Sequence, residues 1–186
     1  MKKTVIIVTL LLAVAILITV GATAAYKTVT AESKNIVTMG NLKIATVSSK
    51  IEGGEKVAQS GNLSLMPSRE ASWIVELENV GGHDAYVRVS VEKIITLAEG
   101  VEGTADTTLV KLNLNTADWT EKEGYYYYNE KLAAGETTKP LFTTVTLDES
   151  CGNMYQGCKV DVKVNASATQ VDNNGENVFE AVWAND

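Results

Sequence analysis

The sequence has a single histidine, His83, among its 186 residues. A zinc peptidase of the common helical type needs two histidines one helical turn apart, and serine or cysteine hydrolases need an imidazole beside the nucleophile. No serine stands in a Gly-x-Ser-x-Gly turn either. We therefore expect no enzyme, with no catalytic residue, metal site or cofactor. His83 is interpreted as a turn residue, and a zinc ion held by His83, Asp84 and distant carboxylates is the weaker alternative.

Basic residues are also few. The chain has 16 Lys and Arg against 23 Asp and Glu, which gives a formal net charge of −7. Nucleic acids and anionic lipid surfaces need clustered Lys and Arg on their protein partners. The acidic balance thus argues against both kinds of partner, and nothing in the sequence indicates a small-molecule substrate.

Long amphipathic helices are missing after the N-terminal region, and no repeat recurs at the periods of solenoids or propellers. What the chain has instead are short stretches in which apolar and polar residues alternate. Period-two alternation is typical of half-buried β-strands, and many short strands predict a sandwich or a barrel. We expect about nine or ten strands in one all-β domain.

The N-terminus has the pattern of a secretory signal peptide. Lys2 and Lys3 precede an uncharged run from Thr4 to Val20, and Ala22-Thr23-Ala24 forms a small-residue cleavage box before Ala25. The alternative is an uncleaved membrane anchor, but a helix of this run spans only about 26 Å, against a bilayer core of about 30 Å. We expect a signal-peptide helix within residues 1–24, its removal on export, and a single domain over 25–186.

Removal of residues 1–24 takes away both of these lysines and no acidic residue, so the formal net charge changes from −7 to −9. That charge suits a secreted protein in the extracellular matrix or at the cell surface.

Only two cysteines are present, Cys151 and Cys158. Exported proteins form disulfides readily, so the sequence predicts a bond between these two. Free thiols and half of a metal site are the alternatives, although a lone Cys-x6-Cys matches no strong metal spacing.

Two pairs of segments look like neighbouring antiparallel strands. Residues 72–79 and 85–92 alternate around Gly81-Gly82, which predicts adjacent strands, although sandwiches often send such strands to opposite sheets. The four tyrosines at 125–128 and the alternating residues 141–147 form the second, hairpin-like pair. The tyrosine run places two rings on each face of its strand, so two in the core and two on the surface is preferred over a carbohydrate-stacking platform.

The same alternation predicts further strands at 25–31, at 36–47 with a bulge or bend at Gly40, and at 110–115. The clearest alternation is in 159–170, which is predicted to be a long strand with one solvent-exposed face. Residues 178–183 are predicted to form a short helix or strand. Asp172–Glu176 lacks the spacing of a calcium loop and is interpreted as a turn.

Over nearly its full length the exported chain resembles the TasA/camelysin family of secreted biofilm-matrix fibre proteins. The resemblance rests on the order of several segments rather than on any one motif. They are the signal end with Ala25-Tyr26, MGNLKI at 39–44, ENVGGHDAYVRVSV at 78–91, GYYYYNEKLAAGETTKPLF at 124–142, and VNASATQVDNNGENVFEAVW at 164–183. Pro67-Ser68, where Pro-Gly is expected, and the cysteine pair depart from the family pattern.

The resemblance implies an antiparallel jelly-roll-like β-sandwich and export through a dedicated signal peptidase. It also implies homopolymeric fibres in which the N-terminal segment of one subunit completes a sheet of the next, with a minor matrix subunit as a candidate second partner. The expected assembly strand lies in 25–31 and includes Tyr26, Thr28, Val29 and Thr30, with Glu32–Asn35 as a hinge, so that 25–35 is a donor-strand-like segment. The alternative function is a monomeric cell-surface adhesin domain that binds a glycan or a protein.

Overall fold

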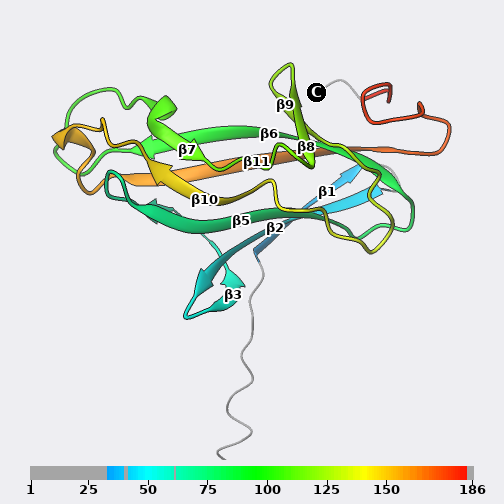
Figure 1. Cartoon of the computed structure of the whole chain (residues 1–186), viewed down its shortest axis with the longest axis horizontal. Helices are drawn as coiled ribbons and strands as arrows, with labels where there is room; N and C mark the ends of the chain where they lie inside the picture. Colours follow the sequence, from blue (N-terminus) through cyan, green and yellow to red (C-terminus); the bar gives the residue numbers. More distant parts are fainter. Residues whose placement is uncertain (1–32, 40–41, 61, 184–186) are drawn as a thin grey trace, which may run out of the picture. The chain divides into compact units, whose positions relative to one another are not determined.

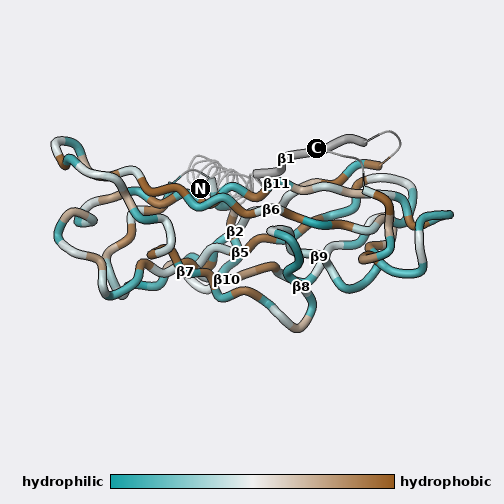
Figure 2. The backbone as a smooth tube through the Cα atoms, turned by 90° about the horizontal axis from the view of Figure 1, so that it is seen from above, coloured by the Kyte–Doolittle hydropathy of each residue, from teal (hydrophilic) through white to brown (hydrophobic). Residues whose placement is uncertain are grey.

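The computed structural model describes residues 33–39, 42–60 and 62–183, and this part of the chain is all-β. Two antiparallel sheets form a β-sandwich-like arrangement, as Figures 1 and 2 show from two directions. The prediction of an all-β, antiparallel fold is confirmed. Two short 3-10 helices, η1 (Thr107–Leu109) and η2 (Asn153–Tyr155), lie in the connections. Among the described residues, no helix is both long and apolar enough to cross a membrane.

The first sheet has the order β1-β2-β5-β10-β7, and β3 also pairs with β2. Its strands are β1 (Ser33–Met39), β2 (Leu42–Glu52), β3 (Glu55–Ala58), β5 (Glu70–Asn79), β7 (Val110–Leu112) and β10 (Phe142–Leu147). β1 and β3 lie on the same side of β2, β1 beside Leu42–Ser48 and β3 beside Ser49–Glu52. One long strand therefore carries two shorter ones along its outer edge.

The second sheet has the order β4-β11-β6-β9-β8. Its strands are β4 (Leu63–Ser64), β6 (Ala85–Thr96), β8 (Trp119–Lys122), β9 (Tyr125–Tyr128) and β11 (Lys159–Gln170). β6 and β11 pair over all twelve residues of each, from Lys159 opposite Thr96 to Gln170 opposite Ala85. This is the longest strand pairing of the sheet, and Figure 1 shows it as the long green and orange strands.

The core lies between the inner faces of the two sheets, and alternation along each strand decides which side chains enter it. On β5 the inward set is Trp73, Val75 and Leu77, and on β6 it begins with Val87 and Val89; all five are at most 4 % exposed. Burying a side chain of this size stabilises the fold by about 1.5–3 kcal/mol. In Figure 2 the tube changes repeatedly between hydrophobic and hydrophilic colours, as expected for strands with one face in the core.

The structure corrects the prediction that 72–79 and 85–92 are adjacent strands. β5 belongs to the first sheet and β6 to the second, so residues 80–84 lead the chain from one sheet to the other. The side chain of Asn79 holds this corner, because its amide Nδ2 donates to the carbonyl oxygens of His83 (2.8 Å) and Leu132 (3.0 Å) while its Oδ1 accepts from the Gly81 N–H (3.0 Å). Asn79 is completely buried.

The second predicted hairpin is also wrong. β9 pairs with β8 and β6 in the second sheet, whereas β10 pairs with β5 and β7 in the first. The segment between them crosses from sheet to sheet and is held on the way by backbone bonds from Gly135 to Asn79 and from Leu141 to Val75. A long polar link gives the chain room to change sheets, which a tight hairpin turn does not.

Three smaller expectations also change. Residues 36–47, predicted as one strand, contribute to two paired strands, β1 and β2. Ser33–Asn35, expected as part of a hinge, already belong to β1. Residues 178–183 form turns and bends rather than a helix or a strand. Ser68, at the position where the resemblance leads us to expect glycine, has a φ of 61°, the left-handed conformation that favours glycine.

Candidate functional site

One side of β11 has few paired strands along it. β6 pairs with β11 along its whole length, but β4, on the other side, pairs only with Lys159 and Val160. Within the part of the chain that the structure describes, no strand pairs with the outer side of residues 161–170, which we call the β11 edge. A row of unpaired backbone N–H and C=O groups of this length is a template for another strand.

A cleft of about 320 Å³ lies beside the β11 edge. It opens between the sheets, where β2 of the first sheet lies opposite β11 of the second. Its lining, the β11 cleft, comprises Thr46, Ser48, Gln59, Ser60, Trp73 and residues 161–165. Most of these side chains are polar, and Asp161 and Lys163 place opposite charges on the β11 side. The sandwich is therefore open along this seam, with hydrogen-bonding groups on both walls.

Trp73 is the buried member of the lining, since its side chain is only 4 % exposed. Its indole Nε1 is buried and has no hydrogen-bond partner among the residues that the structure describes. Trp119 in the second sheet is different, because its Nε1 donates to the carbonyl oxygen of Lys139 (3.1 Å). A buried donor without a partner costs about 1–3 kcal/mol, so the Trp73 N–H is a group that a bound molecule can satisfy.

The predicted assembly and cleavage residues fall outside the described part of the chain. They are Ala22, Ala24 and Ala25 of the cleavage site and Tyr26, Thr28, Val29 and Thr30 of the assembly strand. Their roles stay predictions. Conversely, sequence reasoning did not identify Trp73 or the β11 edge as a site. Alternation predicts which face of a strand is buried, but it contains no information about how many neighbours that strand has.

The cysteines differ from the prediction, because the structure has Cys151 and Cys158 as free thiols rather than as a disulfide. Cys158 is completely buried and belongs to the core, where a thiol packs as a small apolar group, and Cys151 packs against the edge of the core. Burial raises the pKa of both thiols, and for Cys151 the Asp148 carboxylate raises it further.

We expect maleimide at neutral pH to label Cys151 slowly and Cys158 not at all in the folded protein, because a raised pKa leaves little reactive thiolate. In urea without reductant, both thiols should react. Intact-mass spectrometry before and after unfolding measures the number of adducts. A sample that takes up no maleimide in urea until it is reduced would instead contain the disulfide.

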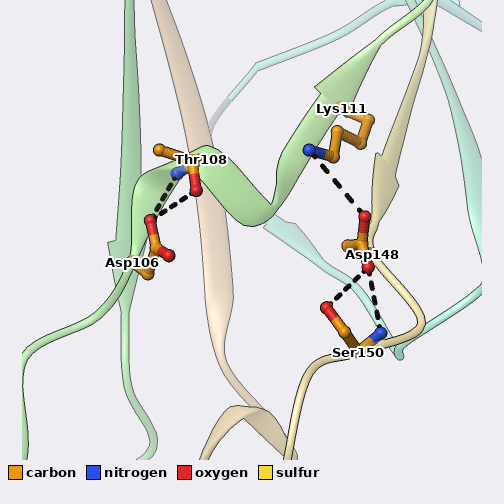
Figure 3. A network of polar contacts seen from close by, with 5 residues as sticks. All are labelled: Asp106, Thr108, Lys111, Asp148 and Ser150. Atoms are coloured by element: carbon orange, nitrogen blue, oxygen red, sulfur yellow. Dashed lines mark hydrogen bonds and ion pairs between the residues drawn. The ribbon is translucent and has the colours of Figure 1, made fainter.

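Two aspartates fix the turns near these cysteines (Figure 3). Asp106 Oδ1 accepts hydrogen bonds from the Thr108 hydroxyl (2.7 Å) and backbone N–H (2.9 Å). Asp148 Oδ1 accepts the same pair from Ser150, at 2.7 Å and 3.0 Å. In each turn, both hydrogen bonds lower the pKa of the aspartate carboxyl group, and the bond from the hydroxyl has the larger effect. This arrangement is a pair of Asx turns, and it stabilises loops rather than supporting chemistry.

Because the lowered pKa values favour the ionised carboxylates in the folded state, their stabilising effect is complete above the unfolded value of about 3.9 and is lost as the pH falls through the folded values. The double variant D106A/D148A should therefore melt at a lower temperature than the wild type at pH 7. The difference should shrink below about pH 4. Thermal unfolding followed by circular dichroism at a series of pH values checks this. E149A, which changes an exposed neighbouring acid, is the control; an equal gap at pH 7 and pH 2.5 would contradict the assignment.

The tyrosine run has the two-faced arrangement that was predicted. Tyr126 and Tyr128 pack with the main core, and Tyr125 and Tyr127 lie in a second cluster on the other face of the sheet. There the guanidinium of Arg88 lies 4.0 Å from the centre of the Tyr125 ring. The C-terminal residues Val178, Ala181 and Trp183 also pack in this cluster. Because the rings of Tyr125 and Tyr127 pack against these residues, nothing supports the hypothesis that they form a platform for stacking carbohydrate.

His83 is exposed in the corner between β5 and β6, where its carbonyl oxygen accepts the bond from Asn79. Among the described residues, no group of three or more His, Cys, Asp or Glu side chains could hold a metal ion. Comparison with protein-family models, with characterised proteins and with solved structures gives no match to this chain, so the β11 edge and its cleft are the observations from which a function is inferred.

Proposed function

We propose that the chain is a secreted structural protein that assembles into extracellular, biofilm-matrix fibres by adding its mature N-terminal strand to the next subunit. The unpaired β11 edge beside an open cleft supports this proposal most directly. An extended peptide that joins a sheet edge gains main-chain hydrogen bonds, and its alternate side chains enter the pockets beside the edge. The β11 edge has both the backbone groups and the pocket for such an addition.

The expected donor is short enough to lie along the β11 edge. The expected donor, residues 25–31, spans about 23 Å when extended, and the β11 edge, residues 161–170, spans about 33 Å. The edge strands β7 and β8 offer less to a partner, because β7 has three residues and β8 has four that include Glu121 and Lys122, and short or charged edges resist pairing. β1, at the end of the first sheet, has seven residues, fewer than the ten of the β11 edge.

The finer fold assignment, a jelly roll, belongs to the same proposal. The passages from β5 to β6, from β9 to β10 and from β10 to β11 each take the chain from one sheet to the other, as the connections of a jelly roll do. The proposal includes export by a dedicated signal peptidase, with cleavage before Ala25. Release of the N-terminus by that cleavage delays assembly until export is complete. Further copies of the chain are the main partner, with a minor matrix subunit as a second.

Electron microscopy of the purified chain that begins at Ala25 tests the proposal. We expect fibres at high protein concentration and none from the uncleaved chain, in which the donor segment has no free end. A mature chain that stays monodisperse at all concentrations would contradict fibre formation.

The alternative function, a monomeric adhesin, is favoured by one observation, the polar lining of the β11 cleft around a tryptophan. Glycan sites commonly combine polar side chains with an aromatic ring. The unpaired edge favours assembly, because a row of backbone N–H and C=O groups is matched by the backbone of another strand. Glycan-array binding by a non-polymerising chain would reverse this preference.

A further inference from the structure

We propose that the indole N–H of Trp73 donates a hydrogen bond to a threonine hydroxyl of the incoming strand, and that the strand therefore enters with Tyr26, Thr28 and Thr30 facing inward. This inference rests on the proposed function and specifies which face of the donor the β11 cleft accepts. It begins from the unpartnered Nε1 of Trp73, which is buried at the cleft.

An extended strand can enter the cleft in only two ways, because its side chains alternate between two faces. One face has Tyr26, Thr28 and Thr30, and the other has Ala25, Lys27, Val29 and Ala31. The second orientation takes the Lys27 ammonium between the sheets, where an ion without a partner is strongly unfavourable. The charged residues of the cleft, Asp161 and Lys163, lie on the partly exposed side of β11, not in the interior.

The first orientation instead leaves Lys27 in solvent and brings hydroxyl groups inward. A threonine hydroxyl can accept one hydrogen bond while it donates another, so it can pair with an indole N–H, which only donates. The indole N–H of Trp73 in one subunit and the threonine-rich face of the incoming strand from the next subunit are therefore complementary. Trp73 thus selects both the face and the chemistry of the strand.

A double-mutant cycle on the mature full-length chain tests this pairing. The variants are W73F, which removes the indole N–H, and T28V/T30V, which replaces both hydroxyls by methyl groups of the same shape. The measurement is the concentration of soluble chain that remains after fibres are sedimented at equilibrium. Each change alone should raise it about 5- to 10-fold, the value of one buried hydrogen bond, and the combination should raise it no further than W73F alone.

W119F is the matched control, because the Trp119 N–H already donates to Lys139 in its own subunit. In W119F the T28V/T30V change should keep its full 5- to 10-fold effect. W119F should also melt at a lower temperature than W73F, since only W119F loses a hydrogen bond of the free subunit. The pairing is overturned if T28V/T30V raises the soluble concentration as much in W73F as in the wild type.

The experiment distinguishes a chain that forms no fibres from a chain whose fibres form without the Trp73–threonine hydrogen bond. If the wild type forms no fibres, the proposed function is wrong, and the same variants are then compared by the melting temperature of the monomer. Coupling between W73F and T28V/T30V in the monomer would place the bond within one chain, with the segment filling its own cleft. Additive effects on melting would overturn the pairing in that setting too.

Discussion

Deletion of residues 25–31 from the mature chain is expected to abolish fibres and leave a folded, soluble monomer. The described strands β1 to β11 begin at Ser33, so the deletion removes none of them. A seven-residue strand added to the β11 edge makes about one main-chain hydrogen bond per residue, each worth about 1 kcal/mol net. The loss of about 6 kcal/mol weakens subunit association by about 10⁴-fold. Electron microscopy and analytical ultracentrifugation measure the two outcomes.

Two variants within the same segment sharpen this result. T28P removes a backbone N–H in the middle of the expected strand and should suppress fibres nearly as strongly as the deletion. K27A should leave assembly within about twofold, because the lysine is expected to remain in solvent. If the truncated chain polymerises as well as the mature chain, the donor-strand proposal is wrong and the adhesin alternative becomes the better one.

Replacement of Asn79 should cause the largest loss of stability at a polar position. N79A leaves the Gly81 N–H and the His83 carbonyl without the partner that the side chain supplied, and it removes one of the bonds to the Leu132 carbonyl. Unsatisfied buried groups cost about 1–3 kcal/mol each, so we expect the free energy of unfolding to fall by about 2–4 kcal/mol. Urea denaturation followed by tryptophan fluorescence measures the change.

The isosteric variant N79D separates hydrogen bonding from shape. Its carboxylate at pH 7 would face the carbonyl oxygens of His83 and Leu132 with no proton to donate, so N79D should be at least as destabilising as N79A. N153A, at an exposed asparagine in η2, is the matched control and should change stability by less than about 0.5 kcal/mol. An N79D variant as stable as the wild type would show that the corner does not depend on this side chain.

Alternation in the sequence predicted the strands well where one face of a strand is buried. The segments 72–79, 85–92 and 159–170 correspond to β5, β6 and β11, and the tyrosine run is β9 with two rings on each face. Which strands pair could not be predicted in the same way. Both hairpins expected from closeness in sequence were wrong, because each connection is long enough to cross between sheets and Asn79 fixes one of these crossings.

The sequence by itself determined the faces of the strands, since burial follows from the local period of two and needs no knowledge of neighbours. It also provided the expected donor segment and its two possible faces, because these depend only on residues 25–31. Only the tertiary structure decided that, within the described residues, β11 is paired with β6 alone along residues 161–170, and that Trp73, whose buried indole N–H has no acceptor there, lines the cleft beside this edge. The physical reason is that an unpaired edge and an unsatisfied donor are properties of what lies next to a residue, and packing brings those neighbours from distant parts of the chain.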